Sequence, residues 1–233
     1  MKRYPDRGLH GRVVDEFGSR IIGGELKVGE ILDPEQIAAN YEVSRTVVRE
    51  AIKVLAGKGL IGARPGHGTF VRDRESWNLL DPDVLRWQFS RVTDAAMLQK
   101  LEEVRAMVEP SAAELAARRR TPEDLRNLFE ALDAMGAPGA DIAVHDERFH
   151  VGLLAATHNE LIEQLSLLIG IGLTARDQFV HSTSISIERS LQMHRDVAEA
   201  VQASDPERAR RAMLTLLAAA ALDVQEAVDS TAH

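Results

Sequence analysis

The residues VSRTVVREAIKVLAGKGLI, Val43–Ile61, decide the fold of the first part of the chain. Ser44 is a favourable residue for capping the N-terminus of a helix. The apolar residues Val48, Ile52 and Leu55 follow it at i, i+4 and i+7, which is the spacing of one buried stripe. The stretch therefore predicts an amphipathic helix.

The other face of this helix is polar and mostly basic, since it carries Arg45, Thr46, Arg49 and Lys53. Scattered charges usually form a solvated face, but a basic face can also lie against an anionic partner. The neighbouring sequence has to decide between these two interpretations.

The composition limits the alternatives. The 233 residues are 45% hydrophobic and 27% charged, with a formal net charge of -8, as expected for a globular protein of one large or two modest domains. Residues 1–76 hold 13 Lys and Arg against 11 Asp and Glu, whereas residues 77–233 hold 15 against 25. The N-terminal part can thus gather its bases on one surface although the whole chain is acidic.

Two further absences are informative. The sequence has neither a membrane-length apolar run nor an N-terminal signal core, so we expect a cytoplasmic protein without a membrane partner. It also has no cysteine, so a metal site would have to use His, Asp, Glu or water.

The N-terminal part predicts a winged helix-turn-helix. Apolar spacing and capping signals indicate helices from Leu9 to the Gly23-Gly24 pair, after Asp33, and after Ser44. The residues LIGARPGHGTFVR then indicate two short strands, 60–64 and 69–72, around a Pro-Gly-His-Gly turn. In this fold the third helix enters the major groove of DNA, and the wing turn places His67 near the backbone or minor groove. A protein-docking winged helix and a merely exposed His67 are the alternatives.

The residues VSRTVVREAIKVLAGKGLI, followed by RPGHGTFV, resemble the DNA-binding domain of the GntR family of bacterial transcription regulators. The resemblance implies double-stranded operator DNA as partner. The residues that we predict to contact it lie at the start of the third helix and in the wing: Ser44, Arg45, Thr46, Arg49, Gly66, His67 and Gly68. The chain departs from the family at Glu35, where an arginine usually contacts DNA, so operator sequence or affinity is expected to differ.

The remaining chain predicts a linker helix and an all-α bundle. We expect domains at 1–76 and 93–233, with a linker helix at 77–92 whose apolar residues Val84, Leu85, Trp87 and Phe89 pack on the bundle. Helix-capping and loop signals, such as the Thr121-Pro122 cap, predict helices near 93–119, 122–135, 141–156, 160–180, 187–203 and 206–228. The fold class is therefore mainly α, a winged helix-turn-helix joined to an antiparallel helical bundle, and a homodimer suits a two-fold operator.

Three residues of the bundle have metal-ligand chemistry. Asp146 and His150 stand at i and i+4 on one helix face, and His194 lies on a later helix. They can hold a divalent metal if the two helices face each other, and the alternative is a solvated Asp–His pair with an unrelated His.

The bundle resembles the C-terminal domain of the FadR subfamily, in which one Asp and three His commonly bind a metal beneath the effector. Asp146, His150 and His194 match three of these ligands, and the fourth falls at about Leu216, which cannot coordinate. The resemblance implies zinc, nickel or manganese on three protein ligands, completed by water or by effector oxygens.

The same resemblance implies an effector. Arg105 matches the arginine that commonly reaches the effector carboxylate, although an interhelix salt bridge is an alternative. Asn159 is a second candidate effector residue, or else a helix cap. The motifs WNLLDPDVLRW, EVRAMVEP and HNELIEQLS resemble regulators of sugar-acid catabolism, so galactonate or a related aldonate is the expected effector and repression the expected outcome.

Two other function classes remain to be tested. Two His and one carboxylate also form the triad of non-haem iron enzymes, although no base or nucleophile accompanies them here. An architectural DNA-binding protein without an effector is the other alternative.

Overall fold

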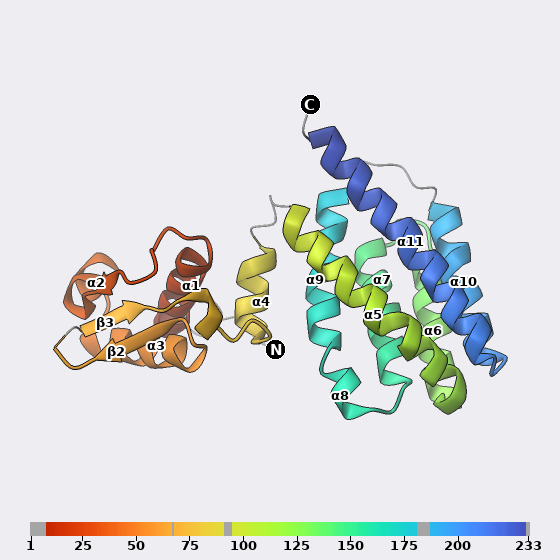
Figure 1. Cartoon of the computed structure of the whole chain (residues 1–233), viewed down its shortest axis with the longest axis horizontal. Coiled ribbons are helices and arrows are strands. Elements are labelled where there is room, and N and C mark those ends of the chain that lie inside the picture. The colour runs from red at the N-terminus through yellow and green to blue at the C-terminus, as the bar shows by residue number, and fades with distance from the viewer. Residues whose placement is uncertain (1–7, 67, 91–94, 181–186, 232–233) are drawn as a thin grey trace. The chain divides into compact units, whose positions relative to one another are not determined.

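The computed structural model describes residues 8–66, 68–90, 95–180 and 187–231 and divides the chain into two compact units, Met1–Arg91 and Val92–His233 (Figure 1). The elements of the first unit are α1 (Gly8–Ile22), β1 (Ile31–Leu32), α2 (Pro34–Asn40), α3 (Arg45–Gly57), β2 (Ile61–Arg64), β3 (Gly68–Val71), the 3₁₀ turn η2 (Arg74–Ser76) and α4 (Pro82–Phe89). Those of the second are α5 (Ala95–Arg119), α6 (Pro122–Met135), α7 (Ile142–Ala155), α8 (Glu160–Glu163), α9 (Ser166–Val180), α10 (Ile187–Gln202) and α11 (Pro206–Thr231). The predicted fold class is confirmed.

The first unit is a winged helix-turn-helix. Its antiparallel sheet has the strand order β1-β3-β2, and Arg64 of β2 pairs with Gly68 of β3 next to the wing turn. One apolar core joins α1, α3 and the sheet, with Phe17, Val48 and Leu55 among its buried members. This packing fixes α3 as a rigid helix whose polar side faces outward.

The start of each of these helices is set by a local cap. Asp33 accepts a hydrogen bond from the backbone N–H of Glu35 at 2.9 Å, and Pro34 occupies the first turn of α2. Ser44 Oγ accepts one from the backbone N–H of Val47 at 3.3 Å. Because both caps satisfy backbone donors that the helix leaves free, the sequence signals located both helix starts correctly.

The second unit is an all-α bundle. Helix α5 packs along α11, α11 along α10, and α7 lies between α6 and α9. Its largest buried cluster is rich in alanine and leucine, including Ala113, Leu128, Phe149 and Val201. Small residues allow the helix axes to approach closely, which brings the polar side chains of α5, α7 and α10 within reach of one another.

Four local expectations differ from the structure. The short strand β1 was not predicted, since two residues carry no periodic signal. Ala51 is fully buried on α3, whereas Ile52 is only partly buried. The predicted helix 160–180 is interrupted, because Leu165 N–H bonds to Ile162 O in a tighter turn between α8 and α9.

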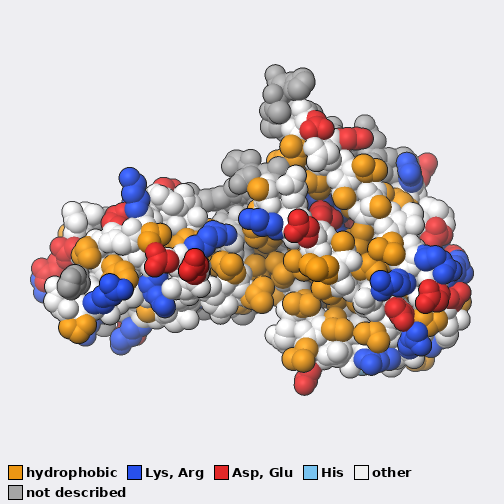
Figure 2. All heavy atoms as spheres, in the orientation of Figure 1, with side chains coloured by type: hydrophobic (Ala, Val, Ile, Leu, Met, Phe, Trp, Pro, Cys, Tyr) orange, Lys and Arg blue, Asp and Glu red, His pale blue; other side chains and the backbone are white. Residues whose placement is uncertain are grey.

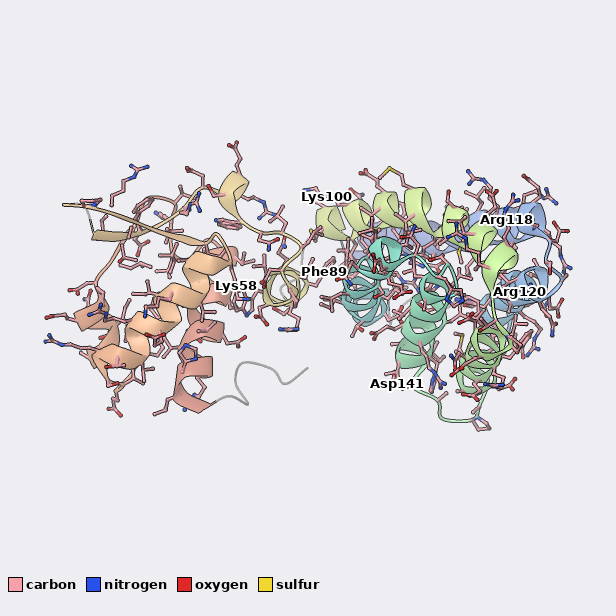
Figure 3. The ribbon with its side chains drawn as sticks, turned by 90° about the horizontal axis from the view of Figure 1, so that it is seen from below. Lys58, Phe89, Lys100, Arg118, Arg120 and Asp141 are labelled. Atoms are coloured by element: carbon pink, nitrogen blue, oxygen red, sulfur yellow. The ribbon has the colours of Figure 1, made fainter. Side chains whose placement is uncertain are left out.

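The fourth difference concerns the predicted linker helix. Val84 and Trp87 of α4 belong to the core of the first unit and not to the bundle. The Trp87 indole N–H donates to Asp15 Oδ1 at 2.8 Å. Lys58, at the end of α3 (Figure 3), bonds to Asp81 Oδ1 at 2.8 Å and to Asp83 Oδ2 at 2.7 Å. Helix α4 is thus fastened to the helix-turn-helix by two polar anchors.

Candidate functional site

The first candidate surface lies where α2, α3 and β3 meet. A hollow of about 540 Å³, called here the basic hollow, is lined by Pro34, Glu35, Arg45, Arg49, Ile52, Lys53 and Thr69. Figure 2 shows basic side chains over the part of the first unit where α2, β2 and β3 lie. The start of α3 therefore presents exposed bases, as an anionic partner requires.

The predicted residues of this surface are arranged as follows. Arg45, Thr46 and Arg49 are exposed at the N-terminal end of α3, while the Ser44 hydroxyl is engaged in the cap. Gly66 and Gly68 have φ of 76° and 78°, a left-handed backbone that glycine adopts without strain. His67 lies outside the described residues.

Five residues that line the basic hollow were not among the predicted contact residues: Pro34, Glu35, Ile52, Lys53 and Thr69. Lys53 lies one turn along α3 from Arg49 and bonds to Glu50 at 2.7 Å. Thr69 comes from β3. The helical spacing of Lys53 was a usable signal, but nothing in the sequence indicates that Thr69 faces α3.

The second candidate site is buried in the bundle and is called here the Asp–His–His cluster. Asp146 and His150 of α7 and His194 of α10 are all buried, and their ligand atoms lie within 4.8 Å of one another. His194 Nε2 is 2.9 Å from Asp146 Oδ1 and 3.3 Å from His150 Nε2. The structure thus brings the three residues together, whereas sequence spacing alone left open whether the two helices face each other.

The protonation of both imidazoles follows from their outer contacts. His150 Nδ1 faces Glu109 Oε2, and His194 Nδ1 lies 2.8 Å from the carbonyl oxygen of Ser190. Because each Nδ1 faces an acceptor, each ring can keep a hydrogen there, and loss of the proton on Nε2 would leave a lone pair on that atom for a cation. The two Nε2 atoms and the Asp146 carboxylate converge on one point, where a cation could take the place of the Nε2 protons.

The Asp146 carboxylate is poised for such a cation. Among the described residues no hydrogen-bond donor reaches its buried Oδ2 atom. Burial alone would raise its pKa, but the positive charge of His150 and His194 and the hydrogen bond from His194 hold the pKa of Asp146 far below its usual value. An ionised, half-unsatisfied carboxylate between two imidazoles has the chemistry of a metal site.

A charged network of α5 supports the cluster from outside. Arg105 is fully buried, and its Nε donates to Glu109 Oε1 at 2.6 Å while Nη1 donates to Glu102 Oε1 at 3.2 Å. Arg105 Nη2 is 3.2 Å from His150 Nε2. Burial would raise the pKa of Glu109, but Arg105 and then His150 lower it to about 2. Arg105 therefore lies at the cluster, and its ion pairs with Glu102 and Glu109 are formed within α5, not between helices as in the salt-bridge alternative.

A small cavity of about 20 Å³ adjoins the cluster, enough for one water or ion. It is lined by Arg105, Asp146, His150, Arg176, Ser190, Met193, His194, Leu216, Ala219, Ala220 and Asp223. Leu216 thus lies beside the Asp–His–His cluster, at the position where the resemblance places a fourth ligand. Arg176 is a member that sequence reasoning missed, and within the described structure its buried Nε has no hydrogen-bond partner.

Glu109 was missed as well, although its i, i+4 spacing from Arg105 on α5 was a usable signal. Asn159 lies elsewhere, in a surface hollow with Arg119 and His158. Its side chain accepts a hydrogen bond from the Leu161 N–H at 3.1 Å, so its observed contact is the helix-cap alternative.

Comparison with known proteins agrees with this two-part arrangement. The model of the FCD domain matches residues 100–219, and that of "Bacterial regulatory proteins, gntR family" matches residues 9–71. The galactonate operon transcriptional repressor of Escherichia coli (strain K12) is 31% identical over 220 residues, which cover 92% of this chain and 96% of that protein. The HTH-type transcriptional regulator LutR of Bacillus subtilis (strain 168) is 35% identical over 212 residues, covering 84% of this chain and 92% of LutR.

A solved structure supports the fold alone. Lar, which controls the expression of the Listeria monocytogenes agr system, has a TM-score of 0.64 at 18% identity, with 93% of this chain and 96% of that chain covered.

No helix within the described ranges is long and apolar enough to cross a membrane. The matched relatives are transcriptional regulators, so the metal-dependent enzyme considered above is excluded. The chain belongs to the gntR family of bacterial regulatory proteins, with a winged helix-turn-helix followed by an FCD domain.

Proposed function

We propose that this transcriptional regulator represses genes of sugar-acid catabolism and leaves its operator when galactonate or a related aldonate binds in the FCD domain. The observation that carries the proposal is the cavity that holds two arginines, Arg105 and Arg176, beside the Asp–His–His cluster. Guanidinium groups bind carboxylates with paired hydrogen bonds. The 31% identity to the galactonate operon transcriptional repressor supports the choice of acid.

The DNA partner is assigned to the basic hollow and the wing. Arg45, Thr46 and Arg49 enter the major groove, where an arginine can make two hydrogen bonds to guanine. Gly66 and Gly68 let the wing backbone approach the phosphates closely, because they lack a side chain. We expect Arg49→Ala to lower operator affinity by on the order of tenfold, corresponding to the loss of one specific base contact.

A divalent metal ion is assigned to the Asp–His–His cluster. The residues fit such an ion, since three acceptor atoms converge there and Asp146 Oδ2 lacks a donor in the described structure. Zinc, nickel and manganese all accept His and carboxylate ligands. A bound ion would supply positive charge and open coordination positions for a carboxylate or hydroxyl oxygen. Glu109 and Ser190 hold the two imidazoles in the tautomer that such binding requires.

The metal is tested by calorimetric titration of chelator-treated protein with each ion. We expect one strong site in the wild type and in His158→Gln, a control at an exposed histidine, and a loss of at least tenfold in affinity for His194→Ala. Equal affinity in all three proteins would show that the ion does not bind at the Asp–His–His cluster.

The size of the cavity indicates how the effector acts. A sugar acid needs a pocket several times larger than about 20 Å³, so the described conformation is closed to it. Binding must therefore favour a second arrangement of the helices around the cavity, α5, α7, α9, α10 and α11. A coupling of about 1–3 kcal/mol between effector and operator is typical of such population shifts.

A homodimer is proposed because a two-fold operator suits a two-fold protein. Figure 2 shows hydrophobic side chains gathered over α5 and α11. Met107 of α5 and Leu222 of α11 are 70% and 65% exposed. We expect sedimentation to give a dimer for the wild type and a lower association constant for Leu222→Glu, and a monomeric wild type would contradict this part.

The central experiment is fluorescence anisotropy of the full-length protein on labelled DNA from its own promoter, titrated with galactonate, related aldonates and lactate at fixed salt. One acid should release the DNA at micromolar to millimolar concentration. Arg176→Gln should need at least tenfold more acid, whereas Arg118→Gln, an exposed control on α5 (Figure 3), should behave as wild type. If the complex forms but no acid releases it, the sugar-acid assignment is wrong while DNA binding stands.

A further inference from the structure

An acid lies inside the otherwise basic hollow of the first unit. Glu35 Oε1 is 3.0 Å from Arg45 Nη1, and the two side chains are 65% and 72% exposed. Among the described residues that line the hollow, Glu35 is the one acid beside Arg45, Arg49 and Lys53. A surface ion pair of this kind contributes little to stability, so the fold gives little reason for its presence.

The backbone brings the two residues of the pair close together. Glu35 is the second residue of α2, and its N–H is held by the Asp33 cap. Arg45 is the first residue of α3, directly after the Ser44 cap. Because both helix starts are fixed by caps, the Glu35 carboxylate and the Arg45 guanidinium stay within reach of each other.

Two physical effects follow when DNA approaches. The carboxylate repels phosphates of any sequence, which weakens non-specific binding. It also pairs with a guanidinium that would otherwise be free to bind the nearest phosphate, since an unrestrained arginine side chain samples many rotamers. Phosphate contacts add affinity without sequence information, whereas base-edge contacts carry the sequence information.

We propose that Glu35 is a specificity-determining residue, which keeps Arg45 from non-specific phosphate contacts and holds it in the orientation for its base contact. This inference rests on the proposed role of the start of α3 in DNA binding. The exchange of Glu35 for a neutral residue should therefore lower the ratio of operator affinity to non-specific affinity, although both complexes gain positive charge.

The test uses the full-length protein and an operator duplex selected from randomised DNA, beside a scrambled duplex of the same composition. For Glu35→Gln we expect non-specific affinity to rise about three- to tenfold and operator affinity to change less than twofold. The plot of log affinity against log salt for the scrambled duplex should become steeper by about 0.9, because Arg45 now neutralises one more phosphate.

The control Glu16→Gln removes an exposed acid of α1 that does not line the hollow, and it should leave the affinity ratio unchanged. The double variant Glu35→Gln/Arg45→Ala should have the same affinity ratio as Arg45→Ala alone, because Glu35 acts through Arg45. If Glu35→Gln raised the affinity for both duplexes equally, Glu35 would act only as a repulsive charge, and the proposal would be overturned. A further fall of the ratio in the Arg45→Ala background would also overturn it.

Failure of the underlying proposed function gives a different result. If Arg45→Ala and Arg49→Ala both bind the operator as tightly as wild type, the start of α3 is not the DNA-contacting surface at all. If they weaken the complex and Glu35→Gln leaves the affinity ratio intact, only the role of Glu35 is wrong.

Discussion

Replacement of Gly18 by alanine should destabilise the first unit through a steric clash with Trp87. Gly18 is buried on α1, and a Cβ added there would lie 2.2 Å from Trp87 Cη2 and 2.3 Å from Cζ3. Carbon atoms pack at about 3.5–4.0 Å, so the indole must retreat by more than about 1 Å. Trp87 is 4% exposed, so there is little room for that movement.

The magnitude has three contributions. Overpacking of a core costs about 1–3 kcal/mol. Movement of the ring also breaks the bond from Trp87 Nε1 to Asp15 Oδ1, a hydrogen bond to a charged acceptor worth about 1.5–3 kcal/mol. Alanine is better than glycine inside a helix by about 0.5–1 kcal/mol, which offsets part of the loss. The net expectation is a loss of about 1.5–5.5 kcal/mol.

The assay follows from the position of the tryptophans. The chain has two, Trp77 and Trp87, and both lie in the unit Met1–Arg91. Tryptophan fluorescence during urea unfolding therefore reports on the first unit, while far-UV circular dichroism is dominated by the helices of the bundle. The fluorescence midpoint should fall and the dichroism of the bundle should be retained.

Two further variants separate the clash from other causes. Gly57→Ala is the matched control, because the described structure has no atom within 4 Å of the added Cβ, and it should be at least as stable as wild type. In a Trp87→Leu background Trp77 still supplies the signal, and Gly18→Ala should then cost under about 1 kcal/mol because the ring is gone. An undiminished cost in that background, or a cost below about 0.5 kcal/mol in the wild type, would refute the steric argument.

Three other predictions follow from single contacts. Burial would raise the pKa of Asp124, but hydrogen bonds from Thr121 and His158 hold it below its usual value, so its capping box contributes full stability above that usual value and loses it as the pH falls through the lowered pKa. Asp124→Asn should accordingly cost about 1 kcal/mol at pH 7 and progressively less as the pH is lowered into the acid range, as measured by urea titration over a series of pH values. Leu216→His should raise divalent-metal affinity by on the order of tenfold in calorimetric titration, since residue 216 lines the cavity beside the three ligands; unchanged affinity would show that position 216 cannot reach the ion. Lys58→Met should destabilise the first unit by about 1–3 kcal/mol in the fluorescence assay, because Asp81 and Asp83 lose their buried ammonium partner while Asp83 keeps its ion pair with Arg86, and a neutral result would mean that water replaces the ammonium group.

Capping explains why the sequence located most helix starts. A side-chain oxygen one residue before the helix satisfies free backbone N–H groups within the next three residues, so the signal is complete inside a short window. This is why Asp33, Ser44 and Thr121 each mark a helix start that the structure contains. The same locality fails for β1, since two residues pair with β3 some forty positions later and show no pattern of their own.

In the candidate site, too, local spacing could be predicted from the sequence, whereas contacts between distant residues could not. The i, i+4 spacing of Asp146 and His150 placed both on one face of α7, because helix geometry alone decides that. The amino-acid sequence by itself determined the mainly α fold class, the basic face of α3 and the chemical types available for a metal site.

Only the tertiary structure decided which of these residues meet. Packing of α10 on the bundle brings His194 to within 2.9 Å of Asp146, and α5 places Glu109 behind His150. The turn from α2 to α3 sets Glu35 against Arg45. These contacts depend on how apolar faces distant in the chain pack together, and since that packing is cooperative over the whole unit, no local spacing in the sequence specifies it.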